Sequence, residues 1–300
     1  MRTSNAAMGL ALLFLGFIWG SSFILMKIAL FASDGTPLFP ALDVAMGRIA
    51  IAGLALLPVA VAHRKHLTRA TLPWLLIVGG VGNLLPAYFF TTAQTLIPSS
   101  VAGMLNALTP MFTFAVGVAI FGTRIKRLQV WGLVVGLIGA AVLAFQPGMG
   151  ASLEPSMVWG AGRVVLATAC YGLSVNLIRN KLGHVPAAAV AALSLGLMSL
   201  PALAVALAGP GLSVAATHPE GPRGLIAVTI LAVVGTGLAL IAFNRIIQKT
   251  NALFASTVTY IIPLFATMWG WLDDEPLTVL HLVGGAVVLV GVWLVSRGGK

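Results

Sequence analysis

Acidic residues are scarce in this sequence: 7 Asp and Glu stand among 300 residues, and all charged residues together make up 8%. A soluble domain usually carries about 25% charged residues, so this composition excludes a water-soluble globular protein. The single cysteine, Cys170, excludes a disulfide framework and a cysteine-based metal cluster. The chain is apolar instead, with 59% hydrophobic residues and a mean hydropathy of +1.03. No stretch is long and polar enough to form a domain outside a membrane.

The apolar residues fall into runs that are separated by Pro, Gly or charged residues. A membrane-spanning helix needs about 20 apolar residues, so a chain of this length holds about ten spans. The runs predict an all-α integral membrane protein with ten transmembrane helices, at 8–31, 41–62, 72–93, 99–121, 128–145, 156–178, 186–208, 222–244, 252–272 and 277–296. The first run follows Arg2, as in a signal peptide, but it is too long for one, and we interpret it as an uncleaved span.

The basic residues indicate how these helices are oriented. With ten spans and a cytoplasmic N-terminus, 13 of the 17 Lys and Arg residues fall on the cytoplasmic side, and all 7 acids fall on the outer side. Cytoplasmic loops of membrane proteins carry an excess of Lys and Arg, so we expect both termini in the cytoplasm. The net charge of +10 therefore reports orientation, and it does not indicate a nucleic-acid partner.

The two halves of the chain resemble each other. Residues 19–27 in the first run are similar to residues 171–179 in the sixth, and Pro110 corresponds to Pro263 at an offset of 153 positions. Internal repeats of this kind decide the architecture. Because each half holds five helices, an odd number, the second repeat must be inverted relative to the first. Inverted repeats are frequent in secondary transporters, whose substrate site lies where the halves meet.

We place the two five-helix repeats at residues 1–148 and 149–300. Glycines recur in the fifth and tenth predicted helices, where Gly132 and Gly139 correspond to Gly284 and Gly291, and Gly136 lies between the first two. Rows of small residues let helices approach closely in a membrane. We therefore expect these two helices to pack within the chain, although the same rows could serve a dimer.

Several motifs together resemble the EamA branch of the drug/metabolite transporter superfamily. They are the W-G-x-x-F-x-x-x-K pattern at 19–27, Arg48, the two prolines, and the pair Asp274-Glu275 before a glycine-rich last helix. The resemblance covers both halves, and it implies export of small metabolites across the bacterial cytoplasmic membrane, with amino-acid exporters among the nearest relatives.

One feature departs from this pattern. Gly122-Thr123-Arg124 follows the fourth helix, where the family has an acid, while the second copy keeps Glu275. We expect the acids at 273–275 to form a solvated loop, and Lys27 to reach water near the outer face.

Arg48 is the most distinctive residue of the predicted spans. It lies roughly 10 Å along its helix from the start near Ala41, where a charge is costly unless it faces a partner or a wet cavity. Asp43, five positions away, is on a different side of the helix and is a poor partner. One interpretation is that Arg48 holds an anionic group such as a substrate carboxylate; the other is that it ties helix ends together through backbone carbonyls.

Polar and aromatic side chains within the spans predict a central cavity between the halves. An amide or indole that pointed into lipid would lack a hydrogen-bonding partner, so these groups should face the interior. The candidate substrate-binding residues are Trp19, Arg48, Asn83, Tyr88, Phe90, Gln94, Asn106, Tyr171, Asn244 and Tyr260, and the threonines 109, 236 and 259 belong to the same polar set. Each could instead serve interhelical hydrogen bonds. Pro110 and Pro263 break equivalent helices, as hinges or as plain kinks.

Several kinds of chemistry have no residues to support them. The interiors of the predicted spans contain no Asp, Glu or His, and the chain has no H-E-x-x-H or Walker-type motif. These absences argue against intramembrane proteolysis, ATP-driven transport and covalent catalysis, and they favour a facilitator or exchanger over a proton-coupled pump.

We therefore expect a secondary transporter that works by alternating access and not an enzyme, with no cofactor and no metal site. Its partners are a small-molecule substrate and membrane lipids, with the chain a monomer or weak homodimer. Two alternatives remain open. One is a drug or lipid-intermediate flippase of the same superfamily. The other is an integral-membrane enzyme acting on lipid-linked substrates, although such enzymes place acids or histidines at the membrane surface and the inner loops hold no acid.

Overall fold

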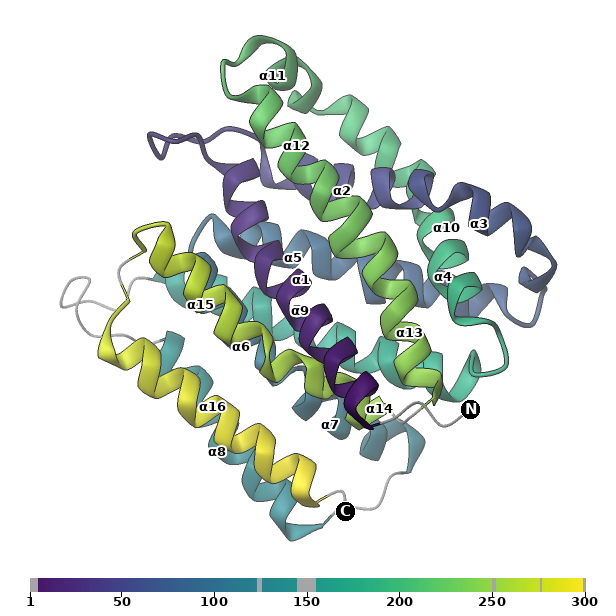
Figure 1. Ribbon diagram of the computed structural model, residues 1–300, viewed down its shortest axis with the longest axis vertical. Helices are drawn as coiled ribbons and strands as arrows, with labels where there is room; N and C mark the ends of the chain where they lie inside the picture. Colours follow the sequence, from purple (N-terminus) through teal and green to yellow (C-terminus); the bar gives the residue numbers. More distant parts are fainter. Residues whose placement is uncertain (1–4, 123–125, 145–154, 250–251, 276, 299–300) are drawn as a thin grey trace.

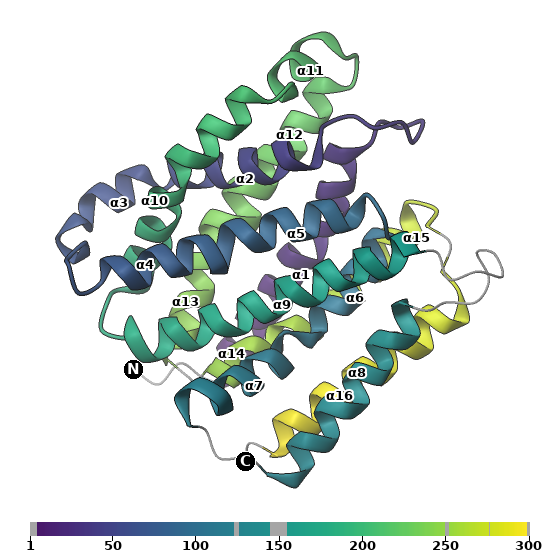
Figure 2. The same ribbon diagram turned by 180° about the vertical axis from the view of Figure 1, so that it is seen from behind.

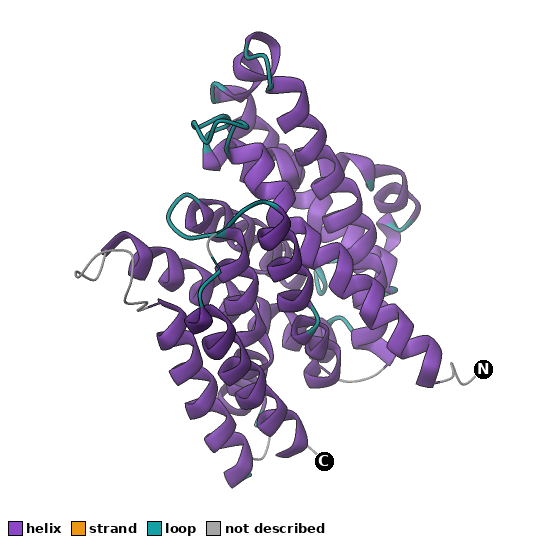
Figure 3. Ribbon diagram, turned by 60° about the vertical axis from the view of Figure 1, so that its left-hand side comes forward, coloured by secondary structure: helices purple, strands orange, loops and turns teal. Residues whose placement is uncertain are grey.

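The computed structural model describes residues 5–122, 126–144, 155–249, 252–275 and 277–298. Within these ranges the chain is helical, with short loops and one isolated bridge between Phe31 and Pro37 in place of any strand (Figure 3). The predicted all-α architecture is confirmed for the part of the chain that the structure describes.

The helices follow the predicted runs closely. The first half contains α1 (Asn5–Leu30), α2 (Ala41–Ala55), α3 (Leu57–Ala62), α4 (Leu72–Gly79), α5 (Leu85–Gln94), α6 (Ser99–Leu105), α7 (Thr109–Phe121) and α8 (Arg127–Ala144). The second half contains α9 (Pro155–Lys181), α10 (Ala187–Ala208), α11 (Gly211–Thr217), α12 (Gly221–Ala232), α13 (Ala239–Lys249), α14 (Ala252–Ser256), α15 (Ile262–Leu272) and α16 (Val279–Gly298).

Six helical stretches are long and apolar enough to cross a membrane. They are Leu10–Leu30, Leu72–Gln94, Ser99–Phe121, Pro155–Lys181, Ala187–Ala208 and Gly221–Lys249. Three shorter apolar stretches lie at Arg127–Gly139, Val258–Leu272 and Val279–Gly291. The remaining predicted span, 41–62, is divided between α2 and α3, where the helix is interrupted at Leu56. The predicted number of ten spans therefore stays a prediction.

Three of the long helical stretches, and the stretch formed by α14 and α15, are interrupted, and the interruptions occur in pairs. A π-helical turn at Gly80–Leu84 joins α4 to α5, and another at Val233–Leu238 joins α12 to α13. These turns begin 153 positions apart, which is the offset that relates Pro110 to Pro263. A 3-10 turn at Asn106–Leu108 precedes α7, and one at Thr257–Tyr260 precedes α15. The same local distortions thus recur in both halves.

Side chains satisfy the backbone groups that these interruptions release. In the two π-turns, Asn83 Nδ2 donates to the Val78 carbonyl at 3.1 Å, and Thr236 Oγ1 donates to the Leu231 carbonyl at 3.0 Å. Each of these bonds reaches back five residues. Because lipid offers no hydrogen bonds to a free carbonyl, a polar side chain is needed at each turn. Asn83 and Thr236 are therefore part of the fold as well as candidates for the site.

The prolines lie in the first turn of the helix after each 3-10 segment. Pro110 is in the first turn of α7 and Pro263 is in the first turn of α15, where the missing N–H of proline is tolerated. Pro110 has no N–H to donate to the carbonyl of Asn106, four residues earlier. This carbonyl accepts a hydrogen bond from the Thr109 hydroxyl at 2.8 Å instead. The predicted break near the middle of both helices is confirmed, while a hinge role for the prolines stays a prediction.

The helices form a bundle whose contacts cross between the two halves. In Figure 1 and Figure 2, α8 and α16 lie side by side along one edge, and α2 packs against α10 on the opposite side. In the middle, α9 packs against α5 and α7, and α1 packs against α12 and α15. The stretches 72–94 and 99–121 thus pack against α9, and the stretches 221–249 and 252–272 pack against α1.

The glycine rows allow the close approach of α8 and α16. A Cβ atom at Gly139 would lie 2.6 Å from the Val288 backbone nitrogen and 2.9 Å from the Gly284 carbonyl, so a side chain there would force the helices apart. The predicted intrachain packing of these two helices is confirmed.

Glu275, which follows α15, is buried against the start of α6. Its Oε1 accepts hydrogen bonds from the Ser99 amide and hydroxyl at 3.0 and 2.7 Å, and its Oε2 accepts the same pair from Ser100 at 3.0 and 2.6 Å. Lys27 Nζ lies 3.1 Å from Glu275 Oε1 and 2.5 Å from Asp273 Oδ2. We call these five residues the Glu275 network. It joins the ends of α1, α6 and α15.

The expected solvated loop at 273–275 is therefore wrong for Glu275, whose side chain is only 4% exposed. The first amides of a helix have no partner within it, and a carboxylate satisfies two of them here. Burial alone raises the pKa of the Glu275 carboxyl, but the hydrogen bonds from Ser100 and Ser99 and the charge of Lys27 hold this pKa below its ordinary value of 4.5.

We predict that Glu275→Gln lowers the thermal stability of the protein. The substitution weakens bonds to a buried charge, each worth about 1.5–3 kcal/mol, whereas Asp274→Asn, in an exposed position with a φ of 55°, should change little. Melting temperatures of the detergent-purified proteins measure this. Since the pKa is lowered in the folded state, the wild-type advantage should be present above pH 4.5 and be lost as the pH falls further. Equal melting temperatures for both variants would contradict the role given to Glu275.

Candidate functional site

A cavity lies in the middle of the bundle and is lined by both halves of the chain. It holds about 970 Å³ of empty space, counting its mouth. Its walls come from α1, α2, α9, α10 and α13 together with the interrupted parts of the long helices. The polar residues that line it are Ser22, Arg48, Asn83, Asn106, Thr109, Tyr171, Ser174, Ser194, Thr236, Asn244 and Thr259.

The interruptions of the helices bring polar residues to this cavity. Asn83 and Thr236, from the two π-turns, both line it, and so do Asn106 and Thr259, from the two 3-10 segments. Asn83 and Thr236 are 153 positions apart in the sequence, and so are Asn106 and Thr259. Corresponding positions of the two halves therefore line the same cavity.

Seven of the ten predicted binding residues line the cavity: Trp19, Arg48, Asn83, Phe90, Asn106, Tyr171 and Asn244. The other three do not. Tyr88 is 37% exposed, with its ring tilted against Phe89, and Tyr260 is partly buried outside the lining. Gln94 is buried one turn beyond Phe90, where its side-chain amide has no hydrogen-bonding partner among the residues that the structure describes.

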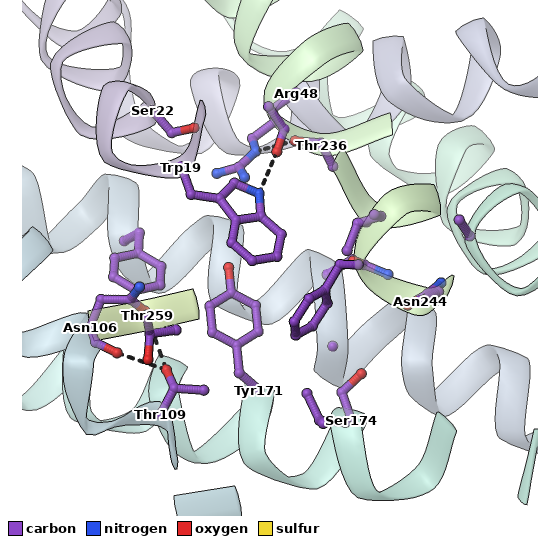
Figure 4. Close-up of a pocket in the computed structure, with 18 of the residues that line it drawn as sticks. Trp19, Ser22, Arg48, Asn106, Thr109, Tyr171, Ser174, Thr236, Asn244 and Thr259 are labelled. Carbon is purple, nitrogen blue, oxygen red and sulfur yellow. Dashed lines mark hydrogen bonds between the residues drawn. The ribbon is translucent and has the colours of Figure 1, made fainter. Parts of the chain in front are cut away.

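Arg48 is the charged residue of the cavity. It is 8% exposed, its Nε donates to Thr236 Oγ1 at 2.7 Å, and its Nη1 lies 3.9 Å from the Met26 sulfur. Within the described part of the chain, the guanidinium makes no ion pair and no hydrogen bond to a backbone carbonyl. Figure 4 shows Thr236 beside the guanidinium and the Tyr171 hydroxyl directed toward the same side of the cavity.

The sequence indicated that Asp43 is a poor partner for Arg48, and in the structure the two residues form no ion pair. Its Oδ2 accepts a hydrogen bond from the Gly211 amide at 2.8 Å, and its carboxylate packs against Gly209 and Gly211 so closely that neither glycine has room for a side chain. Asp43 thus holds α11 against the start of α2, and the charge of Arg48 is left without a carboxylate from this helix.

Aromatic rings make up the apolar walls. Trp19 Nε1 donates to the Gly235 carbonyl in the second π-turn at 2.9 Å, and its ring meets Phe243 edge to face at 4.9 Å between centroids. On the other side, Phe90 stacks on Tyr171 at 5.9 Å and meets Phe23 at 5.5 Å. These contacts fix the rings, so the cavity is preformed.

Some lining residues were not among the predicted binding residues. Phe23 belongs to the motif at 19–27, Ser174 is three positions from Tyr171, and Phe243 is next to Asn244, yet none of them was among the ten. Helical spacing from a predicted residue would have found Ser174, because residues three apart share a face.

The lining has the chemistry that the sequence analysis expected of a binding cavity. It combines one cation, several amides and hydroxyls, and aromatic walls, and no Asp, Glu or His lines it. Within the described residues, no group of three or more His, Cys, Asp or Glu side chains could hold a metal ion.

Comparison with known proteins identifies the family. Residues 7–145 match the EamA-like transporter family, and residues 158–297 match it a second time. The chain belongs to the EamA-like transporter family. This EamA-like protein is therefore a multi-pass membrane transporter and not an enzyme.

Relatives of this EamA-like protein carry transporter names. The uncharacterized inner membrane transporter YedA of Escherichia coli is 26% identical, over 96% of this chain and 90% of its own. The probable terminal-alkyne amino-acid exporter of Streptantibioticus cattleyicolor is 24% identical, over 99% and 95%. The probable amino-acid metabolite efflux pump of Salmonella typhimurium is 23% identical, over 92% and 90%. The family and these names place the protein in the cytoplasmic membrane.

A solved crystal structure has the same fold. One of its chains superposes on this EamA-like chain with a TM-score of 0.64, at 20% identity and over 95% of both chains. At this identity the likeness shows the fold alone.

Proposed function

We propose that this EamA-like protein is a secondary transporter that exports small carboxylate-bearing metabolites, amino acids among them, by alternating access to the central cavity. The observation that carries the proposal is the buried Arg48 guanidinium, which lines the cavity and forms no ion pair with any described residue. The names of the amino-acid exporters among its relatives support the same substrate class.

The geometry of Arg48 suits a carboxylate. A guanidinium has five N–H donors in a planar fork, and a carboxylate can accept two of them at once. Thr236 takes the Nε donor, and Nη1 has only a sulfur atom nearby. A buried charge without a partner is strongly unfavourable, so an anionic group in the cavity would complete the site.

The proposed membrane arrangement is ten spans in two inverted repeats, 1–148 and 149–300, with both termini in the cytoplasm. The paired interruptions at an offset of 153 support the repeats. In Figure 1, α1 begins and α16 ends toward the end of the molecule opposite α11. Lys181 lies over the Trp74 ring, and Arg297 lies over the Trp293 ring. Such pairs of basic and aromatic residues are typical of a membrane interface.

The surface of the bundle is consistent with lipid as its surroundings. Large apolar side chains are exposed on its outer helices, as in Trp131 and Ile138 of α8, Trp159 of α9, and Leu200 of α10. A soluble protein would not expose so many of them together.

We predict that a cysteine at position 66 is labelled only from the cytoplasm and one at position 218 only from outside. The His66→Cys and His218→Cys variants should be made in a Cys170→Ser background, which removes the single native thiol. Maleimide labelling of intact cells and of inverted vesicles measures this. Labelling of position 218 from the cytoplasm alone would contradict ten spans.

We predict that Arg48→Met lowers counterflow of neutral L-amino acids at least tenfold in proteoliposomes that contain only this protein, because charged hydrogen bonds are worth about 1.5–3 kcal/mol. A panel of L-glutamine, L-leucine and L-threonine provides the labelled probes. Arg48→Lys should be intermediate, since it keeps the charge and loses the fork.

The matching competitors are the α-carboxamides of the same amino acids, which we expect to compete poorly because they lack the carboxylate. The proposed function is wrong if no member of the panel is exchanged, or if the α-carboxamides compete as well as the acids.

We predict that Thr236→Val lowers the same counterflow about tenfold while Thr236→Ser keeps it near the wild-type rate. Valine has the shape of threonine but cannot accept the bond from Arg48 Nε or donate to the Leu231 carbonyl. In an Arg48→Met background, Thr236→Val should cause little further loss if it acts through Arg48. A full additional tenfold loss in that background would show that Thr236 acts independently.

A further inference from the structure

Asn244, which lines the cavity, has a side-chain oxygen without a hydrogen-bonding partner among the described residues. In the described part of the chain, the buried side-chain atoms without a hydrogen bond are Oδ1 of Asn244 and both amide atoms of Gln94. Gln94 does not line the cavity, whereas Asn244 does and is 2% exposed. An acceptor buried without a donor destabilises a fold, so its position in a binding cavity points to a ligand.

The neighbouring backbone decides which amide atom is free. Asn244 Nδ2 donates to the carbonyl of Ala187, the first residue of α10, at 3.5 Å. A carbonyl oxygen accepts hydrogen bonds and cannot donate them. The amide nitrogen must therefore face Ala187, and the oxygen is the atom left without a partner.

This oxygen and the Arg48 guanidinium are at different levels of the cavity. Thr236, the partner of Arg48, is eight residues before Asn244 in one continuous helical stretch, η4 and α13, where η4 is the π-turn Val233–Leu238. At 1.5 Å per residue, this separates the two residues by about 12 Å along the axis. The α-ammonium of an amino acid is adjacent to its carboxylate, so it could not reach Asn244 from Arg48.

An apolar wall connects the two levels. Trp19 bonds to the carbonyl of Gly235, next to Thr236, and its ring packs on Phe243, next to Asn244. Figure 4 shows the Trp19 ring within this space, with Arg48 and Thr236 above it. The wall suits a chain of carbon atoms that has polar groups at both ends.

We propose that Asn244 Oδ1 is a second attachment point, which accepts a hydrogen bond from an N–H or O–H group at the end of the substrate opposite its carboxylate. The proposal rests on the proposed function, because it takes Arg48 as the carboxylate subsite. It names the substrate class as elongated carboxylates with a distal donor, such as a side-chain amide or hydroxyl group.

The test compares two ligands of nearly equal size. L-Glutamine has a distal amide that donates, and L-glutamic acid γ-methyl ester has an ester there that only accepts. In wild-type proteoliposomes, unlabelled ester should inhibit counterflow of labelled L-glutamine about tenfold less well than unlabelled L-glutamine does, because it lacks one hydrogen bond.

The variants assign this preference to one residue. Asn244→Leu should bring the two inhibition constants within about twofold of each other by removing the acceptor. Gln94→Leu is the matched control, because it removes a buried amide that does not line the cavity, and it should keep the wild-type preference.

Equal inhibition by both ligands in the wild type would overturn the proposal, and this comparison needs no variant to fold. A wild type that exchanges L-leucine but does not bind L-glutamine would overturn it as well. Neither result affects the carboxylate subsite, which the α-carboxamide competitors and Arg48→Met test separately.

Discussion

A backbone surrounded by lipid must satisfy its hydrogen bonds within the protein, and this constraint shapes both the fold and the cavity. Four of the helical stretches that line the cavity are interrupted, and such interruptions release carbonyls. Asn83, Thr109 and Thr236 donate to such carbonyls at the Val78, Asn106 and Leu231 positions. The polar groups that repair the helices are also those that line the cavity. One set of residues therefore stabilises the interrupted helices and lines the cavity, so substitutions among them should be interpreted with both the fold and the proposed binding role in view.

Much of this architecture could be predicted from the sequence because it depends on local patterns. Apolar runs gave the helices, and the offset between Pro110 and Pro263 located the paired interruptions. Seven of ten predicted residues line the cavity because an amide or indole in a span must face inward. Tyr88, Gln94 and Tyr260 do not line it, since polarity alone does not say where along a helix the cavity ends. The two π-turns were not predicted, because neither Gly80–Leu84 nor Val233–Leu238 contains a proline that would mark an interruption.

The Glu275 network shows a second limit of sequence reasoning. Ser99 and Glu275 are 176 positions apart in the sequence. No local pattern predicts that an acid in a loop will cap a helix at that separation. The structure also gives the missing acid of the first half a physical context. The positions 153 residues after Ser99 and Ser100 are Ala252 and Leu253, which have no hydroxyl groups. The acid and its side-chain donors are absent together, so the two ends of the molecule are held by different interactions.

The single cation of the cavity has an electrical consequence. An empty cavity carries the positive charge of Arg48. A bound substrate with one net negative charge cancels it, whereas a bound substrate with no net charge leaves it unchanged. The membrane potential acts on moving charge with about 2.3 kcal/mol per elementary charge per 100 mV. Under the proposed alternating-access mechanism, a negative cell interior would draw the empty transporter toward the conformation that exposes Arg48 to the cytoplasm. For an anionic substrate, the voltage would then act on the return step of the proposed export cycle.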